Sequence, residues 1–246
     1  MDFTIDKYRQ LLLALQAYGF ESLVLRHDVD LLPGNSLRTA RLEAEMGMFG
    51  VYYFRAVPES WDDEIIREIA SLGHDVGYHY ESLTTCNGDV DAAYQDFCRN
   101  LERLRELVPV KSICMHGSPR SPYDSKDIWK KYDYHALGIE HEPYLDTDFS
   151  KTFYLTDTGR RWDGYKVSVR DKIPQYQDEW TAKGLTFHTT DDVIDGLSQG
   201  RIPLNLMVTV HPQRWNPVGA IWAKELLLQN MKNVVKGIML KVNYHR

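Results

Sequence analysis

The sequence predicts an α/β fold, a distorted TIM-like (β/α)7-8 barrel built as a single domain over residues 1–246. Strand-like and helix-like segments alternate in units of about 25 residues, which is typical of a parallel sheet wound in one direction. Each strand-like segment is one apolar stretch without regular alternation, which indicates that both faces of the sheet are covered. A length of 246 residues is normal for an α/β barrel.

The elements follow from local patterns along the chain. The predicted strands are the apolar and β-branched segments 22–27, 50–54, 75–79, 110–115, 152–156, 185–188 and 204–210. The predicted helices are the segments 36–46, 63–72, 90–107, 191–198 and 220–236. Gly47, Gly73 and Gly200 end three of these helices, and Thr190 is the expected N-cap of another. An open doubly wound sheet is the alternative, although no glycine-rich phosphate loop follows the first strand.

The charge distribution argues against nucleic acid as a partner. The formal net charge is −6, and the basic residues are scattered rather than gathered in a stripe. The nearest candidate for a basic surface is the C-terminal helix, whose lysines are interpreted as a solvated face. These lysines are Lys224, Lys232, Lys236 and Lys241.

Targeting signals and cysteines favour a cytoplasmic protein. The N-terminus lacks the basic start and continuous apolar core of a signal peptide, and no apolar run is long enough to span a bilayer. The three cysteines have no metal-type spacing, which predicts free thiols in a reducing compartment. Cys114 lies in an apolar segment and is expected to fill core space.

Ionisable residues follow the predicted strands at the ends that converge on one face of a parallel barrel. After the first strand, Arg26, Asp28 and Asp30 alternate with His27 and are expected to share one face. Two adjacent carboxylates repel each other unless a cation lies between them, so one can bind a metal ion while the other acts as a base. The alternative is a salt-bridge cluster held by Arg26.

Later strand ends supply histidines and further acids. His79 and His116 are candidate metal ligands, and Glu81 either binds metal or orients His79 from behind. His74 precedes its strand and is expected to be structural. His211 ends the most apolar strand and is a candidate general acid. Asp157 is expected to fix the tautomer of His211.

The segments RHDVD and GHDVGYHYESL resemble the first two motifs of the polysaccharide-deacetylase superfamily, also called carbohydrate esterase 4 or NodB-like. The resemblance runs from about Ser22 to Trp215. It implies that Asp28 is the base and that Asp30 and His79 bind a divalent metal, expected to be zinc. The superfamily's second metal histidine falls on Leu83, so His116 or Glu81 is expected to supply the third ligand.

The other segments of the resemblance bear on substrate binding. Either His116 or the loop Arg120–Tyr123 is the counterpart of the third motif. Asp157 to Trp162 loosely matches the fourth, and His211 matches the fifth as the acid that protonates the leaving amine. Aromatic residues in loops stack on sugar rings in many proteins, or they cap the barrel core. The residues expected to contact substrate are Arg26, Glu81, Arg120, Tyr123, Arg160, Trp162 and Trp215.

The set of motifs is similar to a divergent branch encoded in O-antigen and other surface-polysaccharide loci, of the WbmS type. The resemblance implies a metal-dependent hydrolase that removes an N-acetyl or N-formyl group from a sugar of a surface polysaccharide, such as lipopolysaccharide, or of its precursor. Two alternatives remain open at this point. One is a catalytically altered carbohydrate-binding relative, prompted by Leu83, and the other is a hydrolase of a small non-sugar amide.

Overall fold

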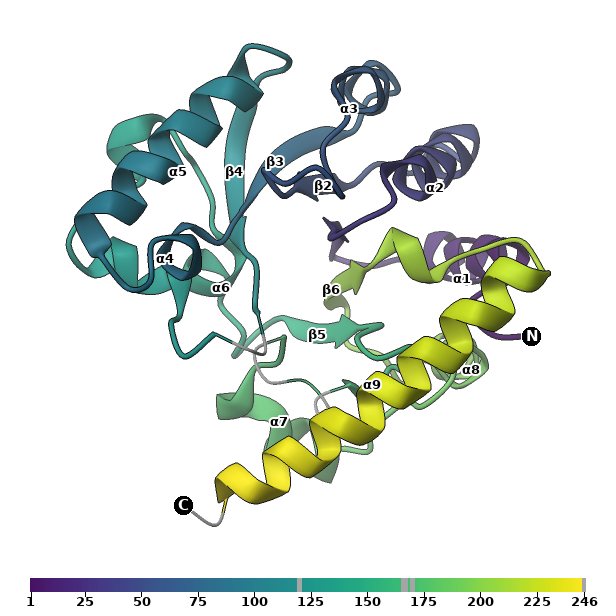
Figure 1. The fold of residues 1–246 in the computed structure, drawn as a ribbon. Helices are drawn as coiled ribbons and strands as arrows, with labels where there is room; N and C mark the ends of the chain where they lie inside the picture. Colours follow the sequence, from purple (N-terminus) through teal and green to yellow (C-terminus); the bar gives the residue numbers. More distant parts are fainter. Residues whose placement is uncertain (119–120, 165–167, 169–170, 245–246) are drawn as a thin grey trace. The chain divides into compact units, whose positions relative to one another are not determined.

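A computed structural model describes residues 1–118, 121–164, 168 and 171–244, with the side chains of the last helix described as far as residue 234 (Figure 1). The chain forms two compact units. The first unit combines Met1–Arg26 with Asp148–Arg246, and the second is His27–Thr147. The boundary falls inside strand β1 (Ser22–Val29), whose residues therefore belong partly to each unit.

The second unit contains strands β2 (Val51–Phe54), β3 (Asp75–Tyr80) and β4 (Val110–Met115) beside the end of β1, in the order β4-β3-β2-β1. The pairs β2·β3 and β3·β4 are parallel. Helices α3 and α5 pack on these strands, and α2 packs on α3 (Figure 1). Its helices are α2 (Pro33–Glu45), α3 (Asp63–Ser71), α4 (Ser82–Thr85), α5 (Val90–Arg105) and α6 (Pro143–Asp146), with 3-10 turns η1 (Ser125–Lys130) and η2 (His135–Leu137).

Capping residues explain where the helices of this unit begin. The Asp62 carboxylate accepts hydrogen bonds from the first backbone N–H groups of α3, and Asp89 does the same for α5. The apolar residues of both helices face a core that includes Ile66, Phe97 and Leu101, which are fully or almost fully buried. Amphipathic helices packed on buried parallel strands are the arrangement that the sequence predicts.

One glycine in β3 is required by close packing. A Cβ atom at Gly77 would lie 2.4 Å from the ring of Tyr53 and 2.9 Å from the carbonyl oxygen of Ser112. Any larger residue would therefore push β3 away from its neighbours. Because His79 is two residues further along the same strand, Gly77 fixes the position from which this histidine projects.

The first unit contains β5 (Phe153–Thr156) and β6 (Asn205–Val210), which pair in parallel, with the start of β1 beside β6. Helix α1 packs against α8. The helices of this unit are α1 (Ile5–Ala17), α7 (Pro174–Ala182), α8 (Thr190–Ser198) and α9 (Ala220–Tyr244), with the 3-10 turn η4 (Pro212–Arg214). The part of the chain that the structure describes has no helix long and apolar enough to cross a membrane.

The predicted α/β class with parallel strands is confirmed, and six strands occur in the described residues rather than seven or eight. The strand predicted at 185–188 is wrong: this segment forms no ladder. Alternate side chains of the segment do point inward, because Leu185 and Phe187 are buried. The segment nevertheless follows α7 as an irregular stretch. The predicted cap of α8 is also off by one residue, since Thr189 forms a capping box with Asp192.

Candidate functional site

Three side chains with metal-binding chemistry converge in the second unit. Asp30 follows β1, His79 lies in β3, and His116 follows β4. The Oδ1 atom of Asp30 lies 3.6 Å from Nε2 of His79 and 3.5 Å from Nε2 of His116. All three ligand atoms lie within 4.8 Å of one another. Residues from three strand ends far apart in sequence thus meet at one point, as the sequence predicts for these three.

The ring of His79 is oriented by a backbone carbonyl group. Its Nδ1 atom lies 2.9 Å from the carbonyl oxygen of Cys114, on the neighbouring strand β4. A carbonyl oxygen only accepts hydrogen bonds, so Nδ1 carries the hydrogen in the neutral ring. The Nε2 lone pair of His79 therefore faces Asp30. Metal-bound histidines in proteins are held by contacts of this kind.

The ring of His116 is oriented by a carboxylate. Its Nδ1 atom donates a hydrogen bond of 2.9 Å to Oε2 of Glu81, which leaves Nε2 directed toward Asp30. Glu81 therefore contacts the nitrogen that faces away from the convergence point. Of the two candidate third ligands, His116 faces Asp30 and Glu81 lies behind His116.

Arg55 binds both the carboxylate of Glu81 and the backbone of Asp30. Its Nε and one terminal nitrogen donate to Oε1 of Glu81 at 3.0 and 2.6 Å. Its other terminal nitrogen donates to the backbone carbonyl of Asp30 at 3.1 Å. Burial would raise the pKa of Glu81, but the contacts with His116 and Arg55 outweigh it and lower that pKa to about 2. Glu81 is therefore ionised across the physiological range.

The geometry fits a divalent transition metal. Zinc bonds of about 2.0–2.1 Å in a tetrahedral arrangement place two ligand atoms about 3.3 Å apart. The two measured separations from Asp30, 3.5 and 3.6 Å, are close to that value. Two imidazole nitrogens and one carboxylate also form a donor set that suits zinc and similar ions, and leave a coordination position for substrate or water.

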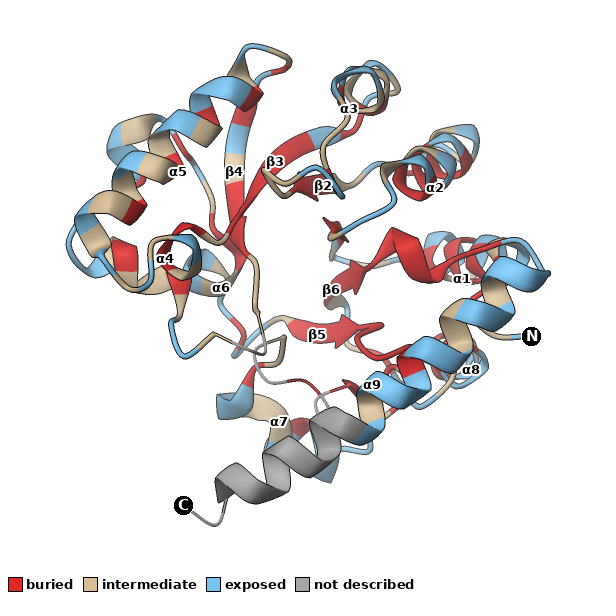
Figure 2. Ribbon diagram, in the orientation of Figure 1, coloured by how far each residue is buried: buried red, intermediate tan, exposed pale blue. Residues whose placement is uncertain are grey.

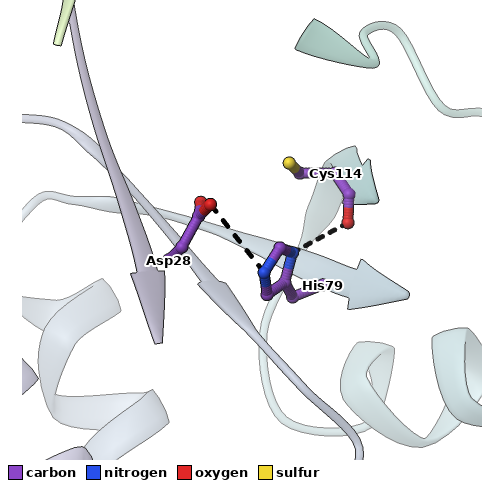
Figure 3. A group of neighbouring side chains, drawn as sticks. All are labelled: Asp28, His79 and Cys114. Carbon is purple, nitrogen blue, oxygen red and sulfur yellow. Dashed lines mark hydrogen bonds and ion pairs between the residues drawn. The ribbon is translucent and has the colours of Figure 1, made fainter. Parts of the chain in front are cut away.

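Asp28 and Cys114 also lie near His79 (Figure 3). Asp28 is buried, with Oδ2 3.8 Å from Nε2 of His79, and the three residues form a second group whose ligand atoms lie within 4.8 Å of one another. Both groups need Nε2 of His79, so only one can hold an ion at a time. The thiol of the buried Cys114 donates to the carbonyl of Met115, away from a metal-ligand role. The set of Asp30, His79 and His116 is thus the better metal centre.

The remaining histidines of this region have structural contacts. His27 points to the opposite face of β1 from Asp28, where its Nε2 lies 2.8 Å from Glu43 and its ring stacks on Tyr52. His74 lies at the start of β3, with Nε2 2.9 Å from the carbonyl of Ala40. The placement of His27 agrees with the alternation of side chains along β1, and that of His74 agrees with its position before its strand, as the sequence predicts.

A second arrangement of ionisable residues lies in the first unit. Nδ1 of His211 donates a hydrogen bond of 2.6 Å to Oδ1 of Asp157, and the backbone N–H of His211 also donates to this carboxylate. The contact fixes the hydrogen on Nδ1 and leaves Nε2 able to transfer a proton. Asp157 follows β5 and His211 follows β6, which are paired strands. The predicted contact between these two residues is present.

Arg214 and Trp215 hold the carboxylate of Asp157 from the other side. A guanidinium nitrogen of Arg214 lies 2.7 Å from Oδ1, and the indole N–H of Trp215 donates to Oδ2 at 2.8 Å. Burial acts to raise the pKa of Asp157, but Arg214 and His211 outweigh it, and the pKa lies below its ordinary value. A negative charge is therefore retained inside the unit beside His211.

Most residues that we expected to bind substrate have other contacts. The rings of Trp162 and Trp215 are buried, and the indole N–H of Trp162 donates to Thr190, so both pack inside the first unit. The guanidinium group of Arg160 is paired with Glu225 of α9. Tyr123 is partly exposed over Gly88. Arg26 is fully buried, and Arg120 lies outside the described residues.

Two arginines were missed by the sequence analysis. Arg55 directly follows β2 and Arg214 lies three residues after His211. Both obey the same strand-end rule that selected the acids and histidines. The local sequence does not signal that these two cations hold carboxylates in place, because their partners, Glu81 and Asp157, are far away along the chain.

Known structures provide a limited comparison. A Streptococcus mutans CE4 esterase matches with 13% identity and a TM-score of 0.47, over 96% of this chain and 88% of that one. A CE4 family pseudoenzyme from Bacillus anthracis matches with 11% identity and a TM-score of 0.42, over 89% of this chain and 63% of that one. A mutant described as a CE4 family pseudoenzyme with restored enzymatic activity gives 12% identity and a TM-score of 0.39, over 89% of this chain and 65% of that one.

The chain thus spans less than two thirds of the length of the pseudoenzyme structures. It matches no protein-family model and no curated protein. Likenesses with TM-scores under 0.5 do not establish a family, so the function has to be argued from the chain's own residues.

Proposed function

We propose that this protein is a metal-dependent hydrolase that removes an N-acyl group, acetyl or formyl, from a sugar. The observation that carries the proposal is the convergence of Asp30, His79 and His116 with both imidazole lone pairs directed at the carboxylate. A second carboxylate, Asp28, lies buried beside this set. A metal centre that activates water, next to a carboxylate that can accept the proton of that water, provides the two groups needed to hydrolyse an amide.

In the proposed mechanism, Asp30, His79 and His116 hold one divalent ion, for which we propose zinc. The ion supplies polarisation of the amide carbonyl and makes water acidic enough to lose a proton near neutral pH. Asp28 accepts that proton as the general base, because its carboxylate lies next to the ligands and is not needed as one. Glu81 and Arg55 keep His116 in its metal-binding orientation throughout.

For His211 we propose the role of general acid toward the leaving amine. Its Nδ1 hydrogen is held by Asp157, and a second proton on Nε2 is stabilised by the buried negative charge of the same carboxylate. An amine is a poor leaving group unless it is protonated as the C–N bond breaks, so amide hydrolysis needs such an acid.

The choice of an N-acylated sugar is supported by the motif resemblance of RHDVD and GHDVGYHYE. On the same basis we propose that the sugar belongs to a surface polysaccharide, such as the O-antigen, or to its precursor, and that the chain belongs to the WbmS-type branch. Cys86 and Cys98 are free thiols, which supports action in a reducing compartment such as the cytoplasm.

One observation favours a second candidate, a metal-free carbohydrate-binding protein. Leu83 stands where the superfamily has a metal histidine, and here it is buried against Ala93 and Ile128. In the hydrolase proposal His116, which follows β4, takes the place of the missing histidine as the third metal ligand. A small non-sugar amide is the third candidate substrate, and the metal centre serves that chemistry equally well.

Metal stoichiometry together with acyl release tests the proposal. Purified protein loaded with Zn²⁺ and dialysed is expected to retain one ion per chain and to release acetate or formate from N-acylated sugars. His116→Ala should abolish retention of the ion, whereas His141→Ala, at a half-exposed histidine of the same unit, should preserve it. Sugar binding without any retained metal would favour the binding protein, and release from simple amides alone would favour the third candidate.

A further inference from the structure

The C-terminal helix α9 exposes apolar side chains along one side. Leu227, Met231 and Val234 are 66, 67 and 64% exposed, and Figure 2 shows that much of the described part of this helix is exposed. At about 100° per residue, these three side chains fall within roughly 60° of one another on the helix surface. We call these three residues the outer stripe.

The opposite side of α9 is fixed to the first unit by polar contacts. The indole N–H of Trp222 donates to the carbonyl of Asp2 at 2.9 Å, and the side-chain amide of Asn233 donates to the carbonyl of Gly159 at 2.8 Å. Glu225 forms its ion pair with the buried Arg160. These anchors determine which side of the helix faces outward, so the exposure of the outer stripe is built into the packing of the unit. A contiguous exposed apolar surface of this kind usually marks a binding surface.

The charge of the same segment is strongly one-sided. From residue 226 to residue 246 the sequence has four basic residues, Lys232, Lys236, Lys241 and Arg246, and no Asp or Glu. The whole chain has a net charge of −6, so the segment differs in sign from the rest of the protein. Among the side chains that the structure describes, Lys224 and Lys232 are exposed. At about 100° per residue, both lie on the same side of the outer stripe, roughly 20° and 100° beyond its nearer edge. The one acid of the helix, Glu225, is paired with Arg160. An apolar stripe with neighbouring cations and no unpaired acid is typical of helices that lie on anionic membranes.

The same charge pattern weighs against a second copy as the partner. The one acid of this helix, Glu225, is already paired with Arg160. Two copies packed stripe to stripe would therefore bring lysines together without a carboxylate to pair with them, whereas helix pairs normally use opposite charges beside the apolar seam. A lipid surface offers both of the required features, since acyl chains receive the apolar residues and anionic headgroups receive the lysines.

We propose that α9 is a membrane-surface helix that docks the protein on anionic lipid. The outer stripe enters the boundary between headgroups and acyl chains, and the lysines lie among the phosphates. Lysines considered alone fit a solvated face, and it is the exposed stripe beside them that changes the interpretation. The proposal is independent of the hydrolase proposal, because no residue of the candidate metal centre lies on α9.

Co-sedimentation of the full chain with vesicles tests this docking. The protein is expected to bind vesicles of phosphatidylcholine and phosphatidylglycerol in equal parts, and to bind vesicles of phosphatidylcholine alone much more weakly. The triple variant Leu227→Ser, Met231→Ser, Val234→Ser should lower partitioning by more than about tenfold. The double variant Lys224→Gln, Lys232→Gln should lower it by roughly fivefold per lysine, with less effect at high salt.

A matched control changes exposed leucines elsewhere in the same unit. Leu13→Ser with Leu204→Ser removes comparable exposed apolar side chains and should leave partitioning unchanged. Circular dichroism should show equal helix content in all variants, since the altered residues are exposed. Equal binding to neutral and anionic vesicles, or full binding by the triple variant, would overturn the proposal. A dimer seen by light scattering that dissociates in the triple variant would also overturn it, in favour of a second copy.

Discussion

Glu81 accepts a hydrogen bond of 2.9 Å from Nδ1 of His116, and this contact determines which nitrogen of the histidine faces Asp30. Without it the ring could rotate or take the other tautomer, and the lone pair would point away from the convergence point. Metal binding by Asp30, His79 and His116 therefore depends on Glu81, which is not itself a ligand.

Replacing this carboxylate should weaken metal binding without removing a ligand. For Glu81→Ala we expect Zn²⁺ affinity to fall by about 10- to 100-fold, the usual range for losing a partner of a metal-bound histidine. Competition titration against a chromogenic chelator measures it. Glu68→Ala is the matched control, because Glu68 pairs with Arg41 on the exposed surface of the same unit. Unchanged affinity in Glu81→Ala would show that His116 is held by something else.

Arg55 should matter through geometry as well as charge. Its guanidinium group binds Glu81 through two nitrogens and the carbonyl of Asp30 through a third. A lysine keeps the charge but cannot span both partners, so Arg55→Lys should lower Zn²⁺ affinity by about tenfold and Arg55→Ala by more. The same titration applies, and Arg41→Lys is the control. Equal affinity of Arg55→Lys and the wild type would reduce the role of Arg55 to charge alone.

Asp28 should separate catalysis from metal binding. Asp28→Asn keeps the shape of the side chain but removes the base, so we expect the ion to be retained while kcat falls by at least about 10²-fold. Metal analysis and acyl release from the same preparation provide both readouts. Full activity in a metal-loaded Asp28→Asn variant would be incompatible with Asp28 as the base.

His211 should matter more for poor leaving groups than for good ones. An aryl ester releases a phenolate that needs no proton, whereas an amide releases an amine that does. We therefore expect His211→Gln to reduce amide hydrolysis by about 10²- to 10⁴-fold and activated-ester hydrolysis far less. Equal losses on both substrates would point to a structural role for His211.

The carboxylate of Asp157 should make stability depend on acid pH. Its pKa is lowered in the folded protein, so the unfolded chain binds more protons in the acid range. The stabilisation is fully present above the unfolded pKa of about 3.9 and is lost as the pH falls through the lower folded value. Urea unfolding between about pH 5 and pH 2 should show this loss, and a flatter profile in Asp157→Asn. An identical pH profile in the variant would contradict the assignment.

Removing this buried charge should also be costly at neutral pH. Asp157→Ala leaves Arg214 buried without its partner, so the free energy of unfolding should fall by about 3–5 kcal/mol. If that variant does not fold, Arg214→Met tests the same pair from the other side, because it leaves the buried carboxylate of Asp157 without its guanidinium partner.

Much of the fold and part of the site could be predicted from the sequence. Apolar stretches identified the six strands that the described residues form, because buried parallel strands leave a strong compositional pattern. The strand-end rule identified Asp30, His79 and His116, and the contact between Asp157 and His211. The false strand at 185–188 arose because Leu185 and Phe187 alternate inward without any partner strand, and a partner is not visible in a local pattern.

Distances between strands could not be predicted. The choice between His116 and Glu81 as third ligand depends on which side chain faces Asp30, and spacing along the chain does not encode this. The same limit applies to Trp162 and Trp215, whose loop positions suggested exposed rings while their packing buries them. Arg55 and Arg214 act on other side chains, so only the three-dimensional contacts reveal them.

The origin of the three candidate ligands from β1, β3 and β4 links ion binding to folding of the second unit. An unfolded chain holds these residues far apart, so it binds an ion much more weakly than the native arrangement does. By mass action, zinc should then raise the thermal midpoint of the protein as its concentration rises above the dissociation constant. Ion availability in the cell would in this way regulate how much of the protein stays folded, and not only how fast it reacts.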